Sequence, residues 1–242
     1  MYQVIGYHRP TSLPQALQLL DSGDRVPLAG GVHLHHDGGA DPTELVDLQA
    51  AGLDTIEVDP ASARLGAMVR LQTLVDEQRL PESIREAARA EQPSTLRTLA
   101  TVGGTIAAAA DHSLLLAALL AHDTSVRLAS EAHGERTASL AELLAEGRRA
   151  GELVAEITVA TDGVAAAAHT GRTPRDVPIV GVVVRRVADT LTFGLCGVAA
   201  TPIRVESDQL ASLEPIDDHR ATAAYRTHLV EVLTGRLLEQ LS

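Results

Sequence analysis

Hydrophobic positions in the first two thirds of the chain fall into two kinds of run. Short runs of β-type composition predict strands over residues 3–7, 25–28, 45–48, 55–58, 64–69, 125–129 and 153–159. Apolar residues at helical spacing predict helices over residues 14–20, 71–79, 82–90, 93–98 and 113–122. The last of these helices is almost wholly apolar, so we expect it to be buried. Strands and helices that follow one another in this way predict an α/β arrangement.

The pattern changes after residue 164. Residues 178–187 and 191–198 are two long apolar runs that flank Ala188 and Asp189, and together they predict a hairpin. The closing stretch, residues 217–241, begins with two aspartates suited to cap a helix. Its apolar side chains recur at helical spacing and are Tyr225, Leu229, Val232, Leu233 and Leu237. The change predicts two domains, residues 1–160 and residues 161–242.

Composition narrows the classes of function. Apolar residues make up 45% of the 242 positions but aromatic residues only 2%, so alanine, leucine and valine fill the interior and aromatic stacking platforms are scarce. A formal net charge of −12 argues against nucleic acid and against an anionic membrane surface, because both attract basic proteins. No apolar run approaches the roughly 20 residues that a membrane helix needs, and no N-terminal signal segment is present. We therefore expect a cytoplasmic protein without membrane insertion.

The single cysteine, Cys196, excludes a disulfide framework and an iron–sulfur cluster ligated within this chain, because such clusters need several thiolates. Cys196 lies in an apolar run and is expected to be a packed core thiol. No Ser-His-Asp or Cys-His arrangement can be argued, so no catalytic side chain is expected. Glu142, Glu146 and the pair Arg148–Arg149 are expected on a solvated helix face.

Two double-glycine turns carry the strongest chemical signal. Residues 28–31 (Leu-Ala-Gly-Gly) and 101–105 (Thr-Val-Gly-Gly-Thr) each follow a β-type run and precede an apolar or alanine-rich segment. Glycine reaches positive φ and lets backbone N–H groups approach an anion, while a following helix adds partial positive charge. We expect the two turns to converge on one pyrophosphate. The alternative is a pair of tight strand-to-helix turns without a ligand, in which Thr101 and Thr105 cap a helix.

Histidines follow the first turn. His33, His35, His36 and Asp37 suggest a metal site, but a histidine-rich polar loop is more simply a solvated one, because metal ligands need fixed geometry and supporting partners. A third interpretation places one of these histidines against the pyrophosphate, where it adds charge to an acidic protein. We expect no metal site.

Longer stretches carry a family resemblance. Residues 96–104, 197–204 and 217–226 are the most specific of them, and shorter stretches at residues 7–13, 45–48, 65–69, 119–123 and 151–154 continue the likeness over nearly the whole chain. Their order is similar to that of the FAD-binding middle subunit of the molybdenum hydroxylase family, which includes carbon monoxide dehydrogenase and xanthine dehydrogenase.

The resemblance implies an α+β fold, in which a two-lobed FAD-binding α/β domain precedes a small C-terminal domain of a three-stranded antiparallel sheet and helices. It implies an oxidoreductase subunit that binds FAD and passes electrons to an acceptor. The electrons would come from an iron–sulfur small subunit, itself supplied by a large subunit that carries a molybdenum cofactor. Asp111 would contact the flavin's sugar-alcohol chain. His169 would lie near the ring, where many relatives carry an aromatic residue and a lysine.

The residues expected to bind the cofactor are therefore Ala29, Gly30, Gly31, Val32, His33, Thr101, Gly103, Gly104, Thr105, Asp111 and His169. Two other hypotheses stay open. The chain could be a stand-alone flavoprotein that acts on a small molecule in secondary metabolism, or a flavin-free relative that serves as a scaffold or binding module. The histidine-rich first turn and the absence of the lysine motivate the stand-alone flavoprotein.

Overall fold

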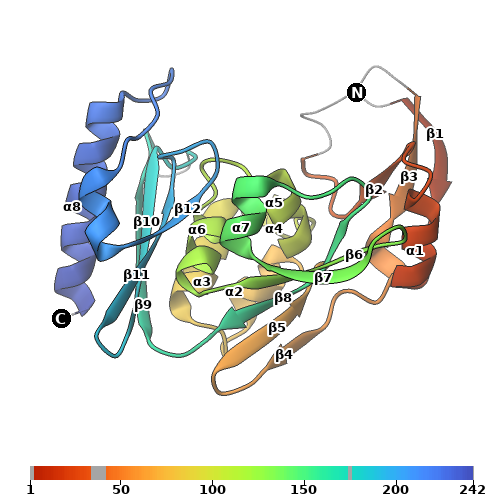
Figure 1. Cartoon of the computed structure of the whole chain (residues 1–242), viewed down its shortest axis with the longest axis horizontal. Coiled ribbons are helices and arrows are strands. Elements are labelled where there is room, and N and C mark those ends of the chain that lie inside the picture. Colours follow the sequence, from red (N-terminus) through yellow and green to blue (C-terminus); the bar gives the residue numbers. More distant parts are fainter. Residues whose placement is uncertain (1–2, 34–41, 174–175, 242) are drawn as a thin grey trace.

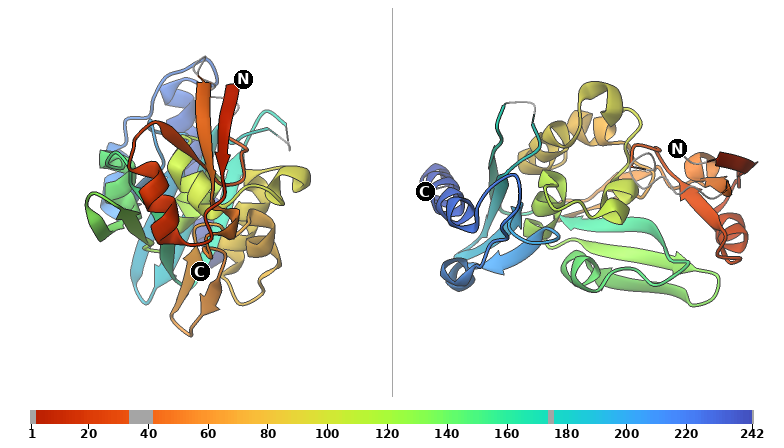
Figure 2. Two further views of the ribbon diagram at one scale, coloured as in Figure 1. Left: turned by 90° about the vertical axis from the view of Figure 1, so that its right-hand side faces the viewer. Right: turned by 90° about the horizontal axis from the view of Figure 1, so that it is seen from above.

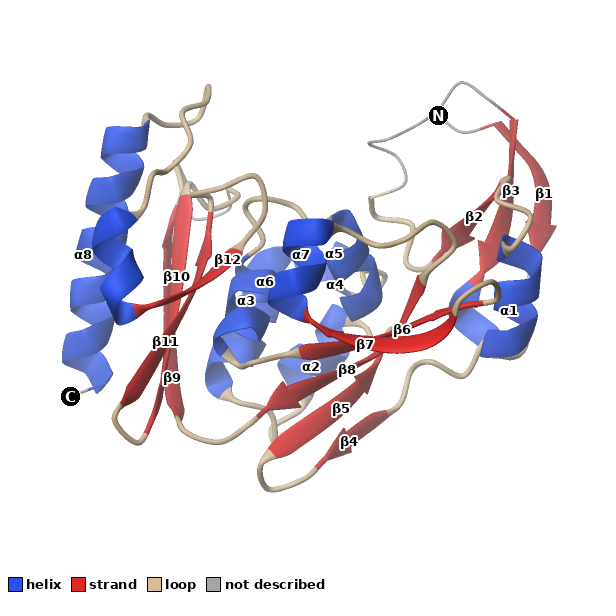
Figure 3. Ribbon diagram, viewed as in Figure 1, coloured by secondary structure: helices blue, strands red, loops and turns tan. Residues whose placement is uncertain are grey.

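The computed structural model describes residues 3–33, 42–173 and 176–241. Three β-sheets follow one another along the long axis of the molecule, with helices between and beside them (Figure 1). Helices and strands contribute in similar measure and are interleaved along the chain (Figure 3). The α+β fold class is confirmed. Among the described residues, no helix is long and apolar enough to cross a membrane.

The first sheet is small and parallel. Its order is β1 (Gln3–His8), β3 (Pro42–Asp47) and β2 (Arg25–Leu28), with β3 in the centre. Helix α1 (Leu13–Leu20) connects β1 to β2, and it begins where the side chain of Ser12 accepts a hydrogen bond from the Gln15 amide. The helix buries Ala16, Leu17 and Leu20. This crossover is the βαβ unit that the alternation of strand and helix predicts.

The second sheet has five strands and is antiparallel. Its order is β4 (Ile56–Val58), β5 (Ser62–Gly66), β8 (Leu153–Ala160), β6 (Ser125–Ser130) and β7 (Gly134–Ser139). The helices of this region are α2 (Leu71–Asp76), α3 (Glu82–Glu91), α4 (Ser94–Arg97), α5 (Val102–Ala108), α6 (Leu114–Ala121) and α7 (Leu140–Glu146). Side chains from this sheet and these helices form the largest hydrophobic core. Helix α6 is buried at every position, as its sequence predicts.

The third sheet has four strands, in the order β12 (Ile203–Glu206), β11 (Thr190–Cys196), β10 (Val180–Val187) and β9 (Val164–Thr170), all antiparallel. The expected hairpin is β10–β11. The expectation of three strands was wrong by one. Strand β9 is the alanine-rich run Val-Ala-Ala-Ala-Ala-His-Thr, which lacks the composition of a typical strand, and β12 spans only four residues, which is too short to give a clear pattern.

Helices cover both faces of this third sheet. Val182 and Val184 pack with α8 (Ala223–Leu241), whereas Val183, which points to the opposite face, belongs to the core around α6. The view from above shows α8 on the outer side of the sheet and the central helices on the inner side (Figure 2). Helix α8 begins six residues after Asp217, whose carboxylate accepts a hydrogen bond from the Ala223 amide at 2.6 Å.

Candidate functional site

The first double-glycine turn follows strand β2 and lies directly against the chain that leads into the second. A Cβ on Gly30 would lie 1.9 Å from the backbone oxygen of Leu99, so only glycine fits at this crossing. Gly31 has a φ of +72°, a left-handed conformation that glycine adopts without strain. The need for glycine at position 30 therefore comes from the close approach of two backbone segments.

The second double glycine lies in the first turn of helix α5 instead of in a turn before it. Thr101 is the N-cap, and its Oγ1 accepts a hydrogen bond from the Gly104 amide at 3.1 Å. The Val102 amide donates to the Val69 oxygen at 2.9 Å, and the Gly103 amide to the Ala67 oxygen at 2.8 Å. The capping role weighed for Thr101 is thus confirmed. The first amides of α5 already have acceptors within the protein.

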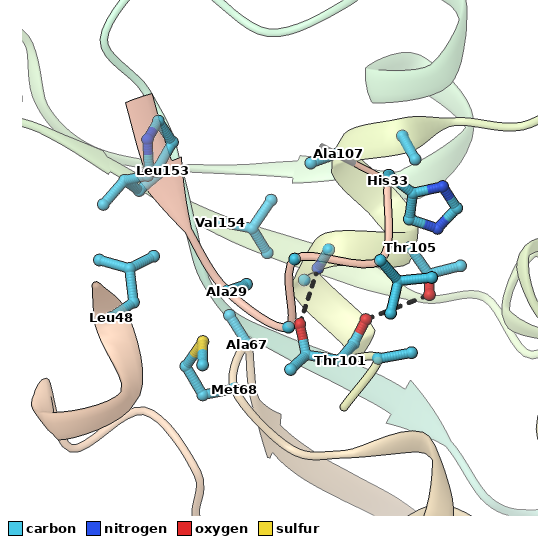
Figure 4. A pocket seen from close by; sticks show the side chains of 18 of the residues that line it. Ala29, His33, Leu48, Ala67, Met68, Thr101, Thr105, Ala107, Leu153 and Val154 are labelled. Carbon is cyan, nitrogen blue, oxygen red and sulfur yellow. Dashed lines mark hydrogen bonds between the residues drawn. The ribbon is translucent and has the colours of Figure 1, made fainter. Parts of the chain in front are cut away.

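Both turns line one cavity of about 310 Å³, and this is the geometry that the sequence predicts (Figure 4). The cavity lies beside strand β8 and the N-terminal end of α5. Nine of the predicted residues line it, namely Ala29, Gly30, Gly31, Val32, His33, Thr101, Gly103, Gly104 and Thr105. A volume near the lower end of the roughly 300–1,000 Å³ range of ligand pockets suits part of a dinucleotide better than the whole molecule.

The free hydrogen-bond donors of this cavity belong to the first turn. Within the described residues, the backbone amides of Gly30, Gly31 and Val32 donate no hydrogen bond to the protein. Partly buried amides without acceptors favour an anion or another acceptor that enters the cavity. The amides of the second turn are mostly satisfied, as shown above. The residues present therefore fit a diphosphate, held mainly from one side.

The cavity has an apolar end and a more polar end. Leu48, Met68 and Leu153 lie on one side of the glycine turns, while His33 and Thr105 lie on the other, with Ala107 beside them (Figure 4). Thr101 lies between these two ends, at the base of α5. An elongated ligand with a charged centre and two different arms matches this division.

The charged side chains of the lining include Arg148, which sequence reasoning missed. Within residues 3–33, 42–173 and 176–241, no carboxylate lines the cavity. Arg148 was expected on a helix face, but helix α7 ends at Glu146, and Arg148 belongs to the loop before β8. The only sequence signal that could have found it is its place next to the family-like stretch at residues 151–154.

Asp111 and His169 lie outside this cavity. Asp111 is 2.8 Å from the Nδ1 of its neighbour His112, and both line a second cavity, formed with residues of the C-terminal domain. His169 lies on β9 opposite Gly181, lines neither cavity, and has a pKa lowered by burial. Their expected roles at the sugar-alcohol chain and at the ring stay predictions. Of the histidine-rich segment, His35, His36 and Asp37 lie outside the described residues.

Cys196 is fully buried in strand β11, as expected. Burial raises the pKa of its thiol, so the sulfur stays protonated at neutral pH. A protonated, enclosed thiol is a poor metal ligand.

Comparison with known proteins agrees with the geometry. Residues 2–161 match the family model described as the FAD-binding domain in molybdopterin dehydrogenase. The uncharacterized protein YgfM of Escherichia coli K12 is 31% identical over 255 residues, which cover 96% of this chain and 94% of that protein.

Solved structures show the same fold. A chain of quinoline 2-oxidoreductase from Pseudomonas putida 86 superposes with a TM-score of 0.87 at 19% identity, and covers 100% of this chain and 98% of that one. A chain of carbon monoxide dehydrogenase from Hydrogenophaga pseudoflava superposes with a TM-score of 0.87 at 23% identity and with the same coverage. A chain of the reconstituted carbon monoxide dehydrogenase from Oligotropha carboxidovorans superposes with a TM-score of 0.85 at 24% identity, again with this coverage.

Proposed function

Because the chain belongs to the family of FAD-binding domains in molybdopterin dehydrogenases, we propose that it is the flavoprotein subunit of a molybdenum-hydroxylase-type dehydrogenase. FAD is the cofactor of this family, and when bound it supplies the ability to accept electrons and hand them on. The chain's own residues bind and orient it. In this proposal the electrons come from iron–sulfur clusters of a partner subunit and leave to a separate acceptor, and the complex works in the cytoplasm.

One observation supports the proposal above the others. The amides of Gly30, Gly31 and Val32 have no acceptor within the described protein, and they face a cavity that both double-glycine turns line. Diphosphate oxygens are the acceptors that such a group of amides binds well. The diphosphate of FAD is accordingly held by backbone groups, which suits a chain with a net charge of −12.

The need for partners follows from the thiol count. Cys196 is the only cysteine, and its buried, protonated sulfur is unsuited to bind iron. The clusters that feed the flavin would then lie outside these 242 residues, and the proposal assigns them to a partner subunit. The similar chains from quinoline 2-oxidoreductase and carbon monoxide dehydrogenase come from oxidoreductases, which supports a subunit role.

Purification from the native host tests this proposal. We expect a yellow sample with absorbance near ~450 nm, FAD as the flavin released on denaturation, and co-purifying chains that contain iron and molybdenum. Yellow protein that travels alone would instead favour the stand-alone flavoprotein. A folded, colourless chain that ignores added FAD would contradict the proposal and favour the scaffold hypothesis.

A pair of matched variants ties the flavin to the cavity. A Cβ on Gly104 would lie 3.0 Å from Thr101 Oγ1 and 3.9 Å from the Cβ of Ala29, at the wall between the two turns. We expect Gly104→Ala to lower the amount of bound FAD. Gly235→Ala, which adds the same methyl group to open space on α8, should leave it unchanged. Equal flavin content in the two variants would argue against this site.

A further inference from the structure

We propose that Arg148 supplies the positive charge that binds the FAD diphosphate from its adenosine side. This inference rests on the proposed function, because it names a contact within the same cavity. Arg148 lines the cavity with both glycine turns, and among the described residues no carboxylate lines it. The diphosphate carries negative charge on each of its two phosphates, and the satisfied amides of α5 can offset little of it.

Arg148 is held in place by one hydrogen bond. Its Nη1 donates to the backbone oxygen of Glu152 at 2.6 Å. Within the described residues, no carboxylate forms an ion pair with it, and its remaining guanidinium N–H groups make no hydrogen bond. A guanidinium offers five donors in a planar fork that matches phosphate oxygens. Most of its donors are therefore free for a ligand.

Glu152 organises the loop that presents this arginine. Its carboxylate is almost fully buried and accepts hydrogen bonds from Arg136 at 2.6 and 2.8 Å and from the Arg149 amide at 2.8 Å. Arg136 lowers the pKa of Glu152, so the carboxylate stays ionised and keeps these contacts. Gly147 and Gly151, with φ of +81° and +75°, bound the loop. The loop conformation is thus set before any ligand arrives.

The hydrogen bond from Arg148 to Glu152 also indicates which arm of the ligand Arg148 contacts. Glu152 directly precedes Leu153, and Leu153 lies with Leu48 and Met68 at the apolar end of the cavity (Figure 4). At the opposite end lies Ala107, and α5 ends at Ala108, three residues before Asp111 of the second cavity. The apolar end suits the adenosine arm, and the opposite direction suits the longer flavin arm. Arg148 then reaches the diphosphate from the adenosine side.

Arg149 provides a matched control. It is the next residue, carries the same charge and is exposed like Arg148, but it does not line the cavity. Its backbone takes part in the hydrogen bonds of the loop: the Arg149 amide donates to the Glu152 carboxylate, and the Arg149 oxygen accepts from the Glu152 amide. Arg149→Gln therefore changes net charge as much as Arg148→Gln does and preserves the loop.

The test is a titration of flavin-free protein with FAD and with ADP, for the wild type, Arg148→Gln, Arg148→Lys and Arg149→Gln. We expect Arg148→Gln to raise the Kd of both ligands on the order of 10-fold to 100-fold, the value of a charge-assisted hydrogen bond. The Kd values of Arg148→Lys should lie between those of the wild type and Arg148→Gln, and the Kd values of Arg149→Gln should stay near those of the wild type. The Kd of Arg148→Gln should also depend less on salt, because one phosphate contact is lost.

This experiment distinguishes failure of the proposed function from failure of the role of Arg148. Wild-type protein that is folded but binds neither ligand would overturn the proposed function itself. Tight binding by the wild type, with equal affinities and equal salt dependence for Arg148→Gln and Arg149→Gln, would overturn the role of Arg148 alone. Circular dichroism of each variant guards against loss of the fold.

Discussion

His122 shows how much a single buried side chain contributes at the scale of residues. Its Nδ1 donates a hydrogen bond to the backbone oxygen of Ala160 at 2.8 Å. Its Nε2 accepts a hydrogen bond from the Ser83 hydroxyl at 2.9 Å. Burial lowers the pKa of His122 to about 4. The imidazole is therefore neutral in the folded protein at physiological pH, and both of its nitrogens are in use.

This pKa predicts a dependence of stability on pH. Between pH 6.5 and pH 4 the unfolded chain binds a proton at His122 that the folded protein does not, so the free energy of unfolding falls as the pH falls through this window. The difference from 6.5 to about 4 corresponds to roughly 3 kcal/mol. Urea unfolding at several pH values should show the slope in the wild type.

His122→Asn provides the comparison for this measurement. Its amide N–H can still donate to Ala160, but it does not titrate in this range. We expect a lower stability at pH 7 and a weaker slope between pH 6.5 and pH 4. An unchanged slope would mean that other groups cause the pH dependence.

Residue roles could be predicted from sequence only where the chemistry is local. The double glycines and the buried thiol of Cys196 follow from residue type. Arg226 and Tyr225, by contrast, both lie in a run that reads as a helix packed against the sheet, yet Tyr225 is 47% exposed and Arg226 is fully buried. Arg226 donates to the backbone oxygens of Ile179 and Gly197 and to Asp218, contacts far apart in sequence that spacing does not reveal.

At the scale of elements, the packing of α6 against β11 joins the central helices to the C-terminal sheet. A Cβ on Gly194 would lie 1.8 Å from the backbone oxygen of Ala117, in the middle of α6. Helix and strand are thus in backbone contact, which only glycine permits. This contact fixes the distance between the C-terminal sheet and the central helices.

Gly194→Ala should therefore be strongly destabilising, because the added methyl group must push α6 and β11 apart. We expect a loss of about 1–3 kcal/mol, as for other overpacked cores. Gly235→Ala places the same group in open space within α8 and should stabilise by up to about 1 kcal/mol through helix propensity. Thermal unfolding of the two variants compares them directly. Equal melting temperatures would contradict the close packing.

Element types were predictable where periodicity is strong, and their ends were not. The run at residues 113–122 predicts α6 within a residue at each end. The second double glycine is predicted as a turn because glycine is a poor helix former. In the structure its amides donate to Ala67 and Thr101, and the two glycines form the first turn of α5. Tertiary contacts that satisfy backbone groups decided the conformation there.

At the scale of the whole molecule, ion pairs centred on Arg185 hold the C-terminal sheet to the rest. Arg185 on β10 is 4% exposed and donates to Asp123 at 2.7 Å and to Asp162 at 2.6 Å. Arg204 on β12 reaches the same Asp123 at 3.0 Å. The two aspartates lie just before β6 and just after β8, so the network spans the boundary between the five-stranded sheet and the C-terminal sheet.

Arg185→Leu should loosen this boundary. Both aspartates are about half exposed and can be rehydrated, so we expect a cost of about 2 kcal/mol, below that of breaking a fully buried pair. Hydrogen exchange should accelerate in β9 to β12 and α8 more than elsewhere. Arg186→Leu, one residue along on the opposite face of β10, should change exchange little. The same exchange pattern in both variants would rule out a specific role for Arg185.

The overall arrangement could be predicted only in outline. Two lobes and a C-terminal unit follow from the change of pattern after residue 164 and from family resemblance. The number of strands in the last sheet could not be predicted, because β9 is alanine-rich and gains its conformation from pairing with β10. The convergence of the glycine turns was predictable, whereas the approach of Arg148 depends on a loop whose position is set by Glu152 and Arg136.

In the proposed function, the amides of the first glycine turn bind the diphosphate of FAD. Titration of ¹⁵N-labelled, flavin-free protein with FAD, followed by NMR, observes this contact at each amide. We expect the amide signals of Gly30, Gly31 and Val32 to shift strongly on binding, while that of Gly235 on α8 does not move. Saturable FAD binding that leaves the three amide signals in place would contradict it.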